Sequence, residues 1–274
     1  MEQHAQNRRI MIATLIAGLV ILLALAAYIF WPAPAPSRPF SVEVTADGAN
    51  KSADEAVAAA GMSAAERKAT EALVKAYILE NPEIITDAVA ILQKREVTKR
   101  LTAAGNDITK VFPGAEAGNP RGDVTIVEFT DYNCGFCRAS VPDMQRLLNS
   151  DGGIRLVYRE LPILSETSRT AASWALAAAS QGKHKAFHDA LFASGRADDA
   201  HIVAAAQAAG LDIAAARKFA ASPVVAQEIE RNLSMMQQIG FNGTPTFIIG
   251  DQILEGALGY EALKSAVEKA RRQG

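Results

Sequence analysis

From Asp123 to the C-terminus, apolar and polar positions alternate between strand-like and helix-like spacing. The runs "DVTIVEFT" and "GIRLVYREL" predict two buried strands, and "CGFCRASVPDMQRLLNS" between them has the spacing of a helix. Further on, "TPTFIIG" and "QILEG" predict two short strands around a turn at Gly250-Asp251, and "YEALKSAVEKARR" predicts an amphipathic closing helix. This order of elements predicts an α/β domain.

Two other stretches have the spacing of helices. The chain from Ser168 to about Ile239 is rich in alanine and predicts a helical block between the second and third strands. Residues 63–104 predict a pair of helices, and the first begins with "SAAE", in which Ser63 and Glu66 form a capping-box pattern.

The paired helices carry apolar stripes that they cannot bury by themselves. The stripes consist of Ala69, Leu73, Ala76 and Tyr77 in the first helix and of Ile85, Ala88, Val89 and Leu92 in the second. A segment of this size is too small to form its own core, so the stripes need a partner. The spacer that follows, Ala103–Ala117, contains glycine and proline, which would loosen packing onto the next domain. We therefore expect a homo-oligomer, with docking on the following domain as the alternative.

The first segment is apolar enough to cross a membrane. Ile10–Trp31 contains no charged residue and slightly exceeds the roughly 20 residues that a spanning helix needs. Arg8 and Arg9 precede it, so the positive-inside rule keeps residues 1–9 in the cytoplasm. The alternative is a cleaved signal peptide, whose apolar core would be only about 7–15 residues long. We expect a single-pass anchor in a bacterial inner membrane, with the Pro/Ala-rich linker 32–62 and the catalytic domain in the periplasm.

The overall charge argues against one class of partner. The 274 residues carry a formal net charge of −2, with 28 Lys and Arg against 30 Asp and Glu. Nucleic-acid binding requires a concentrated basic face, so no nucleic-acid partner is expected. The hydrophobic share of 49% and the charged share of 21% are those of a globular protein.

Both cysteines of the chain, Cys134 and Cys137, lie in "DYNCGFC" directly after the first predicted strand. Such a pair can form a disulfide, hold a metal, or fill space as two small apolar side chains. A structural zinc site typically needs four Cys or His ligands, and here there is one pair. His184 and His188 have ligand spacing, but their polar segment "QGKHKAFHDALF" predicts a solvated or packed helix face. A C-x-x-C pair beside a strand–helix–strand pattern favours redox chemistry, with no metal and no dissociable cofactor.

Cys134 falls at the predicted start of a helix, where unpaired N–H groups and the helix dipole favour an anion. The pKa of its thiol should therefore be lower than that of a free cysteine. Cys137 lies nearly one turn deeper in the helix. A thiolate at Cys134 would attack a substrate disulfide, and Cys137 would resolve the mixed disulfide.

Three motifs, in order along the chain, resemble the DsbA-like branch of the thioredoxin superfamily: "VEFTDYNCGFC", "YRELPILSETS" and "GTPTFIIG". The paired helices, with "YILENPEII", are similar to the N-terminal region of the ScsC group. The resemblance implies an α/β thioredoxin fold at residues 118–274, with a helical domain inserted at about residues 168–239. The transmembrane helix at 10–31 and the helical oligomerisation segment at 63–104 would precede it.

The resemblance also implies roles for single residues. Cys134 corresponds to the nucleophile and Cys137 to the resolving cysteine. Glu128 corresponds to an acidic residue buried beneath the disulfide, although strand alternation leaves open an outward-facing carboxylate. Thr244 and Pro245 correspond to a cis-proline position that pairs with an extended substrate. An ordinary trans proline that opens a strand is the alternative.

Gly135 and Phe136 between the cysteines offer no charge to a thiolate and, with Thr244 before the proline, resemble the isomerase side of the family. The resemblance implies a thiol–disulfide oxidoreductase that forms, reduces or isomerises disulfides, with isomerase or reductase activity favoured. Its partners would be exported protein substrates, bound through backbone and apolar contacts, and a membrane or periplasmic redox partner that resets the dithiol. The alternative is a copper-handling or chaperone-like module, since soft thiolates suit Cu(I). The chain has no Met-rich or His-rich tract that would favour dedicated copper transport.

Overall fold

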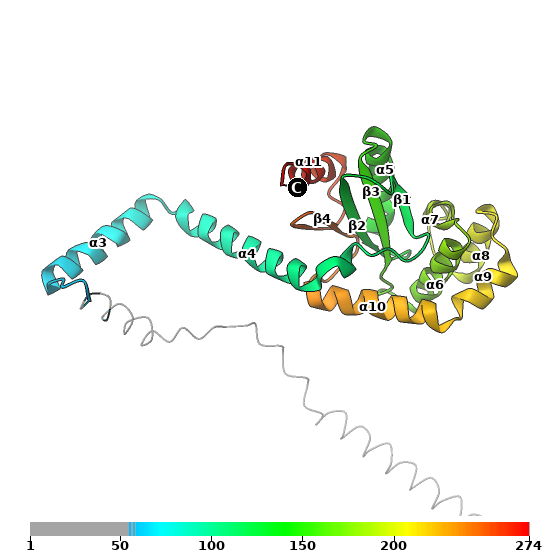
Figure 1. Ribbon diagram of the computed structural model, residues 1–274, viewed down its shortest axis with the longest axis horizontal. Helices are drawn as coiled ribbons and strands as arrows, with labels where there is room; N and C mark the ends of the chain where they lie inside the picture. The colour runs from blue at the N-terminus through cyan, green and yellow to red at the C-terminus, as the bar shows by residue number, and fades with distance from the viewer. Residues whose placement is uncertain (1–54, 56, 58, 274) are drawn as a thin grey trace, which may run out of the picture. The chain divides into compact units, whose positions relative to one another are not determined.

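The computed structural model describes residues 55, 57 and 59–273 (Figure 1). The chain divides between Glu80 and Asn81 into two compact units. The first contains α3 (Ala64–Glu80). The helices of the second unit are α4 (Glu83–Ala104), the 3-10 helix η1 (Gly105–Ile108), α5 (Gly135–Ser150), α6 (Glu166–Ser180), α7 (His184–Ala193), α8 (Asp199–Ala208), α9 (Ile213–Ala220), α10 (Pro223–Ile239) and α11 (Tyr260–Gln273). Its strands are β1 (Glu116–Gly118), β2 (Val124–Thr130), β3 (Ile154–Glu160), β4 (Thr246–Ile249) and β5 (Gln252–Glu255).

The five strands form one sheet in the order β1-β3-β2-β4-β5. The central pair, β2 and β3, is parallel, and the other neighbours are antiparallel. Six of the seven residues in each central strand are buried, because helices cover both faces of the sheet. Parallel strands covered on both sides read as continuous apolar runs, and this is the pattern that predicted them. The predicted hairpin around Gly250-Asp251 is confirmed by the pairing of β4 with β5.

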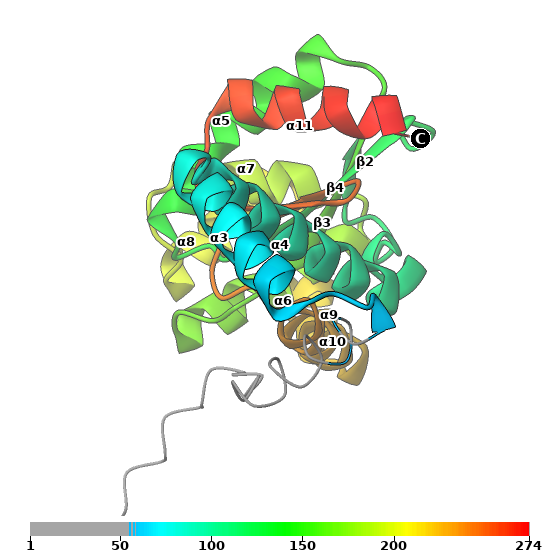
Figure 2. The same cartoon turned by 90° about the vertical axis from the view of Figure 1, so that its left-hand side faces the viewer.

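The two faces of the sheet have separate cores. On one face, Ile126, Leu156 and Phe247 pack with residues of α5 and α11. On the other face, Phe129 and Val157 pack with residues of α10 and of the end of α4. Figure 2 shows α5 and α11 on one side of the strands and α10 on the other. The sheet is therefore the middle layer of a three-layer domain.

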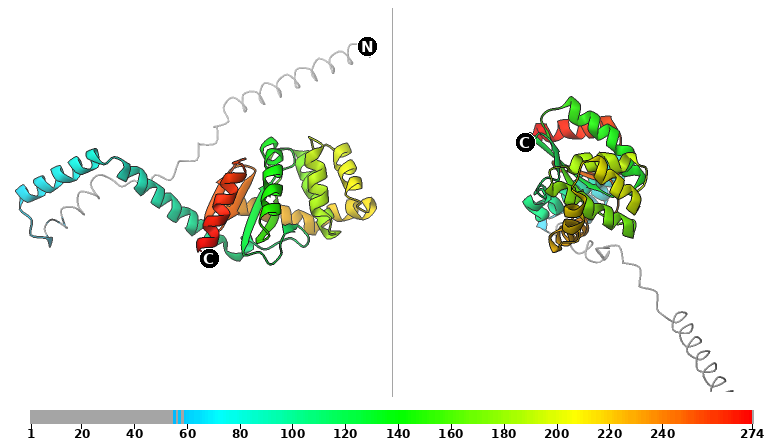
Figure 3. Two further views of the ribbon diagram at one scale, coloured as in Figure 1. Left: turned by 90° about the horizontal axis from the view of Figure 1, so that it is seen from above. Right: turned by 90° about the vertical axis from the view of Figure 1, so that its right-hand side faces the viewer.

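The short helices α6 to α9 group together at one side of the sheet, as the views in Figure 3 show. They have an apolar core of their own, built around Trp174, Phe187 and Phe192. Cys134 and Cys137 belong to the same cluster of buried side chains. The helical block thus forms part of the wall around the two thiols.

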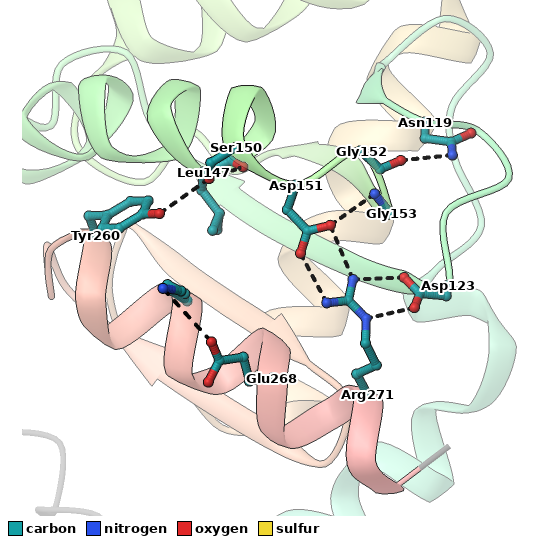
Figure 4. A network of polar contacts seen from close by, with 11 residues as sticks. Asn119, Asp123, Leu147, Ser150, Asp151, Gly152, Gly153, Tyr260, Glu268 and Arg271 are labelled. Carbon is teal, nitrogen blue, oxygen red and sulfur yellow. Dashed lines mark hydrogen bonds and ion pairs between the residues drawn. The ribbon is translucent and has the colours of Figure 1, made fainter.

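Arg271 of α11 binds two aspartates that lie just before β2 and just after α5 (Figure 4). Its Nε and Nη2 donate to Asp123 at 2.6 and 2.9 Å, and its Nη1 donates to Asp151 at 3.0 Å. These hydrogen bonds lower the pKa values of both carboxyl groups. Asp123 precedes β2 and Asp151 follows α5, so one guanidinium ties three elements together.

The spacer was predicted to loosen packing onto the following domain, and at the end of α4 it does not. Leu101 at the end of α4 and Ile108 in η1 are buried against the sheet. The fully buried Arg159 of β3 donates to the backbone carbonyls of Asp107, Ile108 and Lys110. The carbonyl groups of the spacer therefore serve as ligands for a buried cation, and the end of α4 docks on the domain.

The apolar stripes of the paired helices are nevertheless exposed over most of their length. The predicted capping box is confirmed, since Ser63 N and Oγ both donate to Glu66 Oε2, at 2.8 and 2.7 Å. No residue of α3 is buried among those the structure describes. The exposed large apolar side chains are Leu73, Val74, Tyr77 and Leu79 in α3 and Ile85, Val89, Ile91 and Leu92 in α4.

The expected single-pass location in an inner membrane, with the catalytic domain in the periplasm, has to be corrected. Within residues 55, 57 and 59–273, no helix is long and apolar enough to cross a bilayer. The 22-residue α4 has sufficient length, but charged residues occur throughout it, whereas a spanning helix needs about 20 predominantly apolar residues. The predicted segment Ile10–Trp31 lies outside the described residues, as do residues 1–9 and most of 32–62.

Candidate active site

Cys134 occupies the cap position of α5, at the carboxyl end of the central strand β2. Its backbone is extended, with φ −80° and ψ 118°, and its Sγ accepts the N–H of Cys137 at 3.4 Å. A cap residue normally uses a side-chain oxygen to accept one of the free N–H groups of the first turn, and here a sulfur takes that place. As predicted, the first cysteine stands at the start of a helix.

The surroundings of the Cys134 sulfur favour its thiolate form. The pKa of Cys134 is lowered to about 5, chiefly by a hydrogen bond from the Cys137 side chain and also by the N–H groups of Cys137 and Phe136. The side chain is 6% exposed. Cys134 therefore combines a stable anion with limited access from solvent.

Cys137 lies in the opposite environment. Its side chain is fully buried in the first turn of α5. Burial raises the pKa of Cys137, and the neighbouring Cys134 raises it further. Both cysteines are free in this structure, so at neutral pH the dithiol carries one negative charge, on Cys134.

The Thr244-Pro245 peptide bond is cis and faces the first thiol. Cys134 Sγ lies 3.1 Å from the backbone oxygen of Thr244. The residue next to Pro245, Thr246, is fully buried and its Oγ1 donates to Gly243 O at 2.7 Å. The structure thus places the start of β4 against the cap of α5, as the sequence motifs predict.

Glu128 is buried in the middle of β2, with 2% of its surface exposed. It faces a small cavity of about 10 Å³, whose lining includes Val141 and Met144 of α5 and Tyr158 of β3. Among the described residues no hydrogen bond joins Glu128 to either thiol. Burial raises the pKa of Glu128 to about 8, and the charge of Glu160 raises it as well. The inward orientation is settled, and an outward-facing carboxylate is excluded.

The two residues between the cysteines differ in what they expose. Phe136 is 68% exposed. Gly135 has open space around it, since an added Cβ would meet no atom within 4 Å. No backbone constraint at this position therefore requires glycine.

Sequence reasoning missed the polar network that joins Tyr132 and Glu160 to the two histidines. Glu160, Tyr132, His184 and His188 are all buried, and Tyr132 packs in the same cluster as the two cysteines. His184 Nε2 lies 2.8 Å from Glu160 Oε1, and Tyr132 Oη lies 3.3 Å from both Glu160 Oε1 and His188 Nδ1. The two histidines were predicted to lie on a solvated or packed helix face, and they are packed. The sequence signal was the four-residue spacing of His184 and His188.

Within the described part of the chain, no group of three or more His, Cys, Asp or Glu side chains is placed to hold a metal ion. The chemistry that the geometry supports is thiol–disulfide exchange at Cys134 and Cys137.

Residues 125–268 match the family described as DSBA-like thioredoxin domain. Residues 66–97 match the family described as Copper resistance protein ScsC N-terminal domain. The first match covers more than half of the chain and includes both cysteines and the cis peptide bond.

Solved structures agree with these matches. A thioredoxin-like oxidoreductase from Silicibacter pomeroyi DSS-3 is 42% identical, with a TM-score of 0.58 over 61% of this chain and 98% of that chain. The thiol-disulfide exchange protein alpha-DsbA2 from Wolbachia pipientis is 27% identical, with a TM-score of 0.61 over 65% and 97%. A linker-deletion mutant of Proteus mirabilis ScsC is 25% identical, with a TM-score of 0.61 over 78% and 98%.

The curated relatives are much longer proteins. Na(+)/H(+) antiporter NhaA 1 of Salinispora arenicola is 32% identical over 150 residues, which are 54% of this chain and 23% of that protein. The NhaA antiporter of Herminiimonas arsenicoxydans is 30% identical over 156 residues, with 54% and 24% covered. The chain thus spans about a quarter of the length of the curated relatives it matches.

The predicted thioredoxin-like α/β fold is confirmed by the strand order and by the family match. The two thiols at the start of α5 and the cis peptide bond beside them agree with the same fold. The chain belongs to the DsbA-like thioredoxin-domain family of thiol–disulfide oxidoreductases.

Proposed function

We propose that this oxidoreductase is a disulfide isomerase of protein substrates, with Cys134 as the nucleophile and Cys137 as the resolving thiol. The observation that carries the proposal is the contrast between the two sulfurs. Cys134 has a pKa of about 5, whereas Cys137 is fully buried and its pKa is raised. Since the thiolate is the reactive form of cysteine, attack begins at Cys134.

The isomerase cycle needs no net transfer of electrons. The Cys134 thiolate attacks a wrong substrate disulfide, so that a mixed disulfide forms and one substrate cysteine leaves as a thiolate. The released substrate thiolate attacks a second disulfide of the substrate, so that a new disulfide forms and another substrate cysteine leaves as a thiolate. In the last step that thiolate attacks the substrate sulfur of the mixed disulfide, a second new disulfide forms, and Cys134 leaves as a thiolate. The low pKa of Cys134 favours this step, because thiols of lower pKa leave faster.

Cys137 releases the substrate from mixed disulfides that do not rearrange. Its thiol loses a proton and attacks Cys134 Sγ, the substrate leaves as a thiol, and a Cys134–Cys137 disulfide remains. Two electrons then have passed from the dithiol to the substrate. A redox partner with its own dithiol has to return them before the next cycle.

Oxidation of substrates is the less favoured direction. The strongest oxidants of this chemistry owe their potential to a strongly stabilised reduced form. Gly135 and Phe136 supply no positive charge beside the Cys134 thiolate. Hydrogen bonds and the start of α5 stabilise it without a neighbouring cation, which supports a potential suited to exchange.

Exposed apolar side chains beside the thiols support protein substrates. Phe136 and Leu164 are 68% and 54% exposed. The N–H of Leu164 donates to Asp131 Oδ2 at 3.0 Å, and Asp131 lies three residues before Cys134. Non-native proteins expose apolar segments, and these two side chains can bind them next to the nucleophile.

The exposed stripes of α3 and α4 support self-association of the chain. Large apolar side chains in both helices are about half or more exposed, and monomeric proteins rarely expose large contiguous apolar patches. Several Cys134 sites in one assembly would act on one captured substrate at high effective concentration. Repeated attack on the same substrate is what isomerisation requires.

The test uses the full chain in its reduced form and a substrate with scrambled disulfides, without added glutathione. We expect recovery of native substrate with no change in its number of disulfides. Cys134→Ser should abolish recovery. The matched variant Cys137→Ala should retain recovery while long-lived mixed disulfides accumulate. Faster oxidation of a reduced substrate by the disulfide form than rearrangement of the scrambled one would instead identify an oxidase.

A further inference from the structure

Asn133 connects the catalytic helix with two loops of the helical block. It directly precedes Cys134, the cap residue of α5. The β3–α6 loop, residues 163–168, includes the first turn of α6, and the α7–α8 loop consists of residues 194–198. The residues that the Asn133 side chain contacts in these loops are 32 to 35 and 64 positions away along the chain.

The α7–α8 loop decides how the amide group of Asn133 is oriented. The backbone N–H of Ala197 donates to Asn133 Oδ1 at 3.2 Å. Because an N–H group can only donate, the oxygen and not the NH2 group has to face it. The NH2 group is then directed at the β3–α6 loop, where it contacts Ser165 Oγ at 2.9 Å, Thr167 Oγ1 at 2.9 Å and Ser168 Oγ at 3.1 Å. One side chain therefore uses its acceptor for one loop and its donors for the other.

The two loops depend on Asn133 to different degrees. Ala197 is fully buried and packs in the same apolar cluster as both cysteines. A buried N–H group that loses its acceptor costs the free energy of its desolvation. The hydroxyl groups of the β3–α6 loop also contact one another, since Ser165 Oγ lies 3.0 Å from Ser168 Oγ. Loss of the Asn133 amide would therefore loosen the α7–α8 loop most.

Asp131 holds the β3–α6 loop from a second side. Its carboxylate is 2% exposed and accepts the N–H groups of Ile163 and Leu164 at 2.9 and 3.0 Å. It also accepts the backbone N–H of Asn133 at 2.8 Å. The same carboxylate thus fixes the loop that carries the exposed Leu164 and the backbone of the residue that binds this loop.

We propose that Asn133 is a positioning residue for substrate binding, because its amide holds the β3–α6 loop and the α7–α8 loop at a fixed separation beside Cys134. The inference rests on the proposed function, since it concerns protein segments that bind at this thiol. A segment binds more tightly to loops that are already ordered than to loops that it has to order itself. Asn133 therefore acts on the affinity for the substrate.

The thiolate itself should not depend on the Asn133 amide. The pKa of Cys134 is lowered chiefly by a hydrogen bond from Cys137, with further contributions from Thr244 and from the N–H of Phe136. None of these groups belongs to Asn133. Affinity and thiol pKa are therefore two properties that substitutions of Asn133 can change separately.

Two substitutions should have opposite effects on these properties. Asn133→Asp keeps an acceptor for the N–H of Ala197, and the hydroxyl groups can turn to donate to its second oxygen, so both loops stay in place. It also adds a negative charge one residue before Cys134. The alkylation midpoint of the thiol, about pH 5 in the wild type, should then rise by up to about 1 pH unit. Asn133→Ala adds no charge, so the midpoint should stay near that of the wild type while binding weakens.

The binding probe is a short synthetic peptide whose cysteine forms a disulfide with glutathione and is flanked by leucines. The Cys134 thiolate of the reduced full chain attacks the peptide sulfur, and glutathione leaves as a thiolate. The Cys137 thiol loses its proton and attacks Cys134 Sγ, and the peptide leaves and takes up a proton. The rate of peptide release at increasing peptide concentration gives the half-saturation concentration and the rate at saturation. The measurement is made well above the alkylation midpoint, where the thiol is ionised in every variant.

We expect Asn133→Ala to raise the half-saturation concentration about fivefold, the effect of one or two side chains that have to be ordered on binding. The rate at saturation should not change. Asn133→Asp should keep the half-saturation concentration of the wild type. A general loss of stability would not produce this exchange of effects between the two variants.

A wild-type half-saturation concentration in folded Asn133→Ala would overturn the proposal, and so would an equal increase in Asn133→Asp. If Asn133→Ala does not fold, Asn133→Leu fills the same space without hydrogen bonds and takes its place. The peptide assay follows one round of exchange without rearrangement inside a substrate. A failed isomerase assay with the expected peptide affinities would therefore refute the isomerase function alone, and equal affinities with a working isomerase would refute this inference alone.

Discussion

The three residues before Cys134 each form hydrogen bonds with a different part of the fold and so hold the nucleophile in place. Asp131 accepts the N–H groups of Ile163 and Leu164, at 2.9 and 3.0 Å, and so holds the loop after β3. The hydroxyl group of Tyr132 donates to the buried Glu160 Oε1 at 3.3 Å. The amide nitrogen of Asn133 contacts the hydroxyl groups of Ser165, Thr167 and Ser168, and its oxygen accepts the N–H of Ala197. The cap of α5 is therefore held by strand, loop and helical block at once.

At this scale we predict how the two thiols react with pH. Alkylation of Cys134 should follow a midpoint near pH 5, because the thiol is unreactive below its pKa and the thiolate reacts above it. Cys137 should remain unreactive in the folded protein. The largest cause of the low pKa is the hydrogen bond from Cys137, so Cys137→Ala should raise the midpoint and Cys137→Ser should raise it less.

Iodoacetamide labelling followed by mass spectrometry of each cysteine gives both profiles. Titration of Cys134 near the value of about 8.5 for a free thiol, or faster labelling of Cys137, would reverse the assigned roles.

The cysteine pair could be predicted from the sequence, whereas the polar residues around it could not. Strand, turn and helix follow one another within a few residues, so local pattern places Cys134 at a helix start. The contact between Glu160 and His184 joins residues 24 positions apart and depends on how α7 lies over β3. Nothing in the polar segment around His184 indicates that its imidazole is buried.

At the scale of the elements, β3 carries a buried arginine, Arg159, whose guanidinium needs several hydrogen-bond acceptors. Arg159 has its Nη1 at 2.9 Å from Glu228 Oε1 and 3.1 Å from Asn232 Oδ1, and its Nη2 contacts the carbonyl groups of the α4–η1 segment. The contacts with Glu228, Asn232 and Ile108 are buried, and those with Asp107 and Lys110 are partly buried. The guanidinium therefore joins α4, η1 and α10 to the sheet.

We predict that Arg159→Met reduces the free energy of unfolding by about 3–5 kcal/mol, because the buried carboxylate of Glu228 then keeps only the half-exposed Arg231, at 3.4 Å, as a partner. The matched variant Arg155→Met on the same strand removes the pair with Glu116 at 2.9 Å, which is about a quarter exposed. That change should cost at most about 1 kcal/mol. Urea unfolding followed by circular dichroism measures both, and equal losses would contradict the role of Arg159.

The docking of α4 shows why the spacer was misjudged from its sequence. Glycine and proline in Ala103–Ala117 indicate turns, and turns by themselves predict loose attachment. In the fold, the turns bring three carbonyl groups to one buried guanidinium. A single arginine in a strand does not reveal which distant carbonyls it will bind.

For the whole molecule, the exposed stripe of α3 leads to a prediction about assembly. Leu73 belongs to this stripe and is 70% exposed. Leu73→Glu places a charge in the stripe and should convert an oligomer of the full chain to a monomer. The control Lys75→Glu changes a charge on the other side of the helix, about 200° from Leu73 at 3.6 residues per turn, and should leave the assembly intact. Light scattering at micromolar concentration compares the two.

The same variant connects assembly with activity. Leu73→Glu should keep the wild-type alkylation profile of Cys134 and lose part of its isomerase rate, since effective concentration falls when sites separate. A wild-type chain that is monomeric at this concentration would refute self-association and leave α3 without an assigned partner.

The adjacent Arg159 and Glu160 also bear on how β3 finds its place during folding. Six of the seven residues of β3 are buried, on both faces, so apolar alternation does not distinguish one register from the next. A shift by one position would turn Glu160 toward Glu228 and the carbonyl oxygens that now bind Arg159, and would leave buried carboxylates together without a cation. Such burial costs several kcal/mol. Arg159 and Glu160 thus make the shifted register less stable than the native one. A purely apolar strand in the centre of this sheet would not discriminate between the two registers in this way.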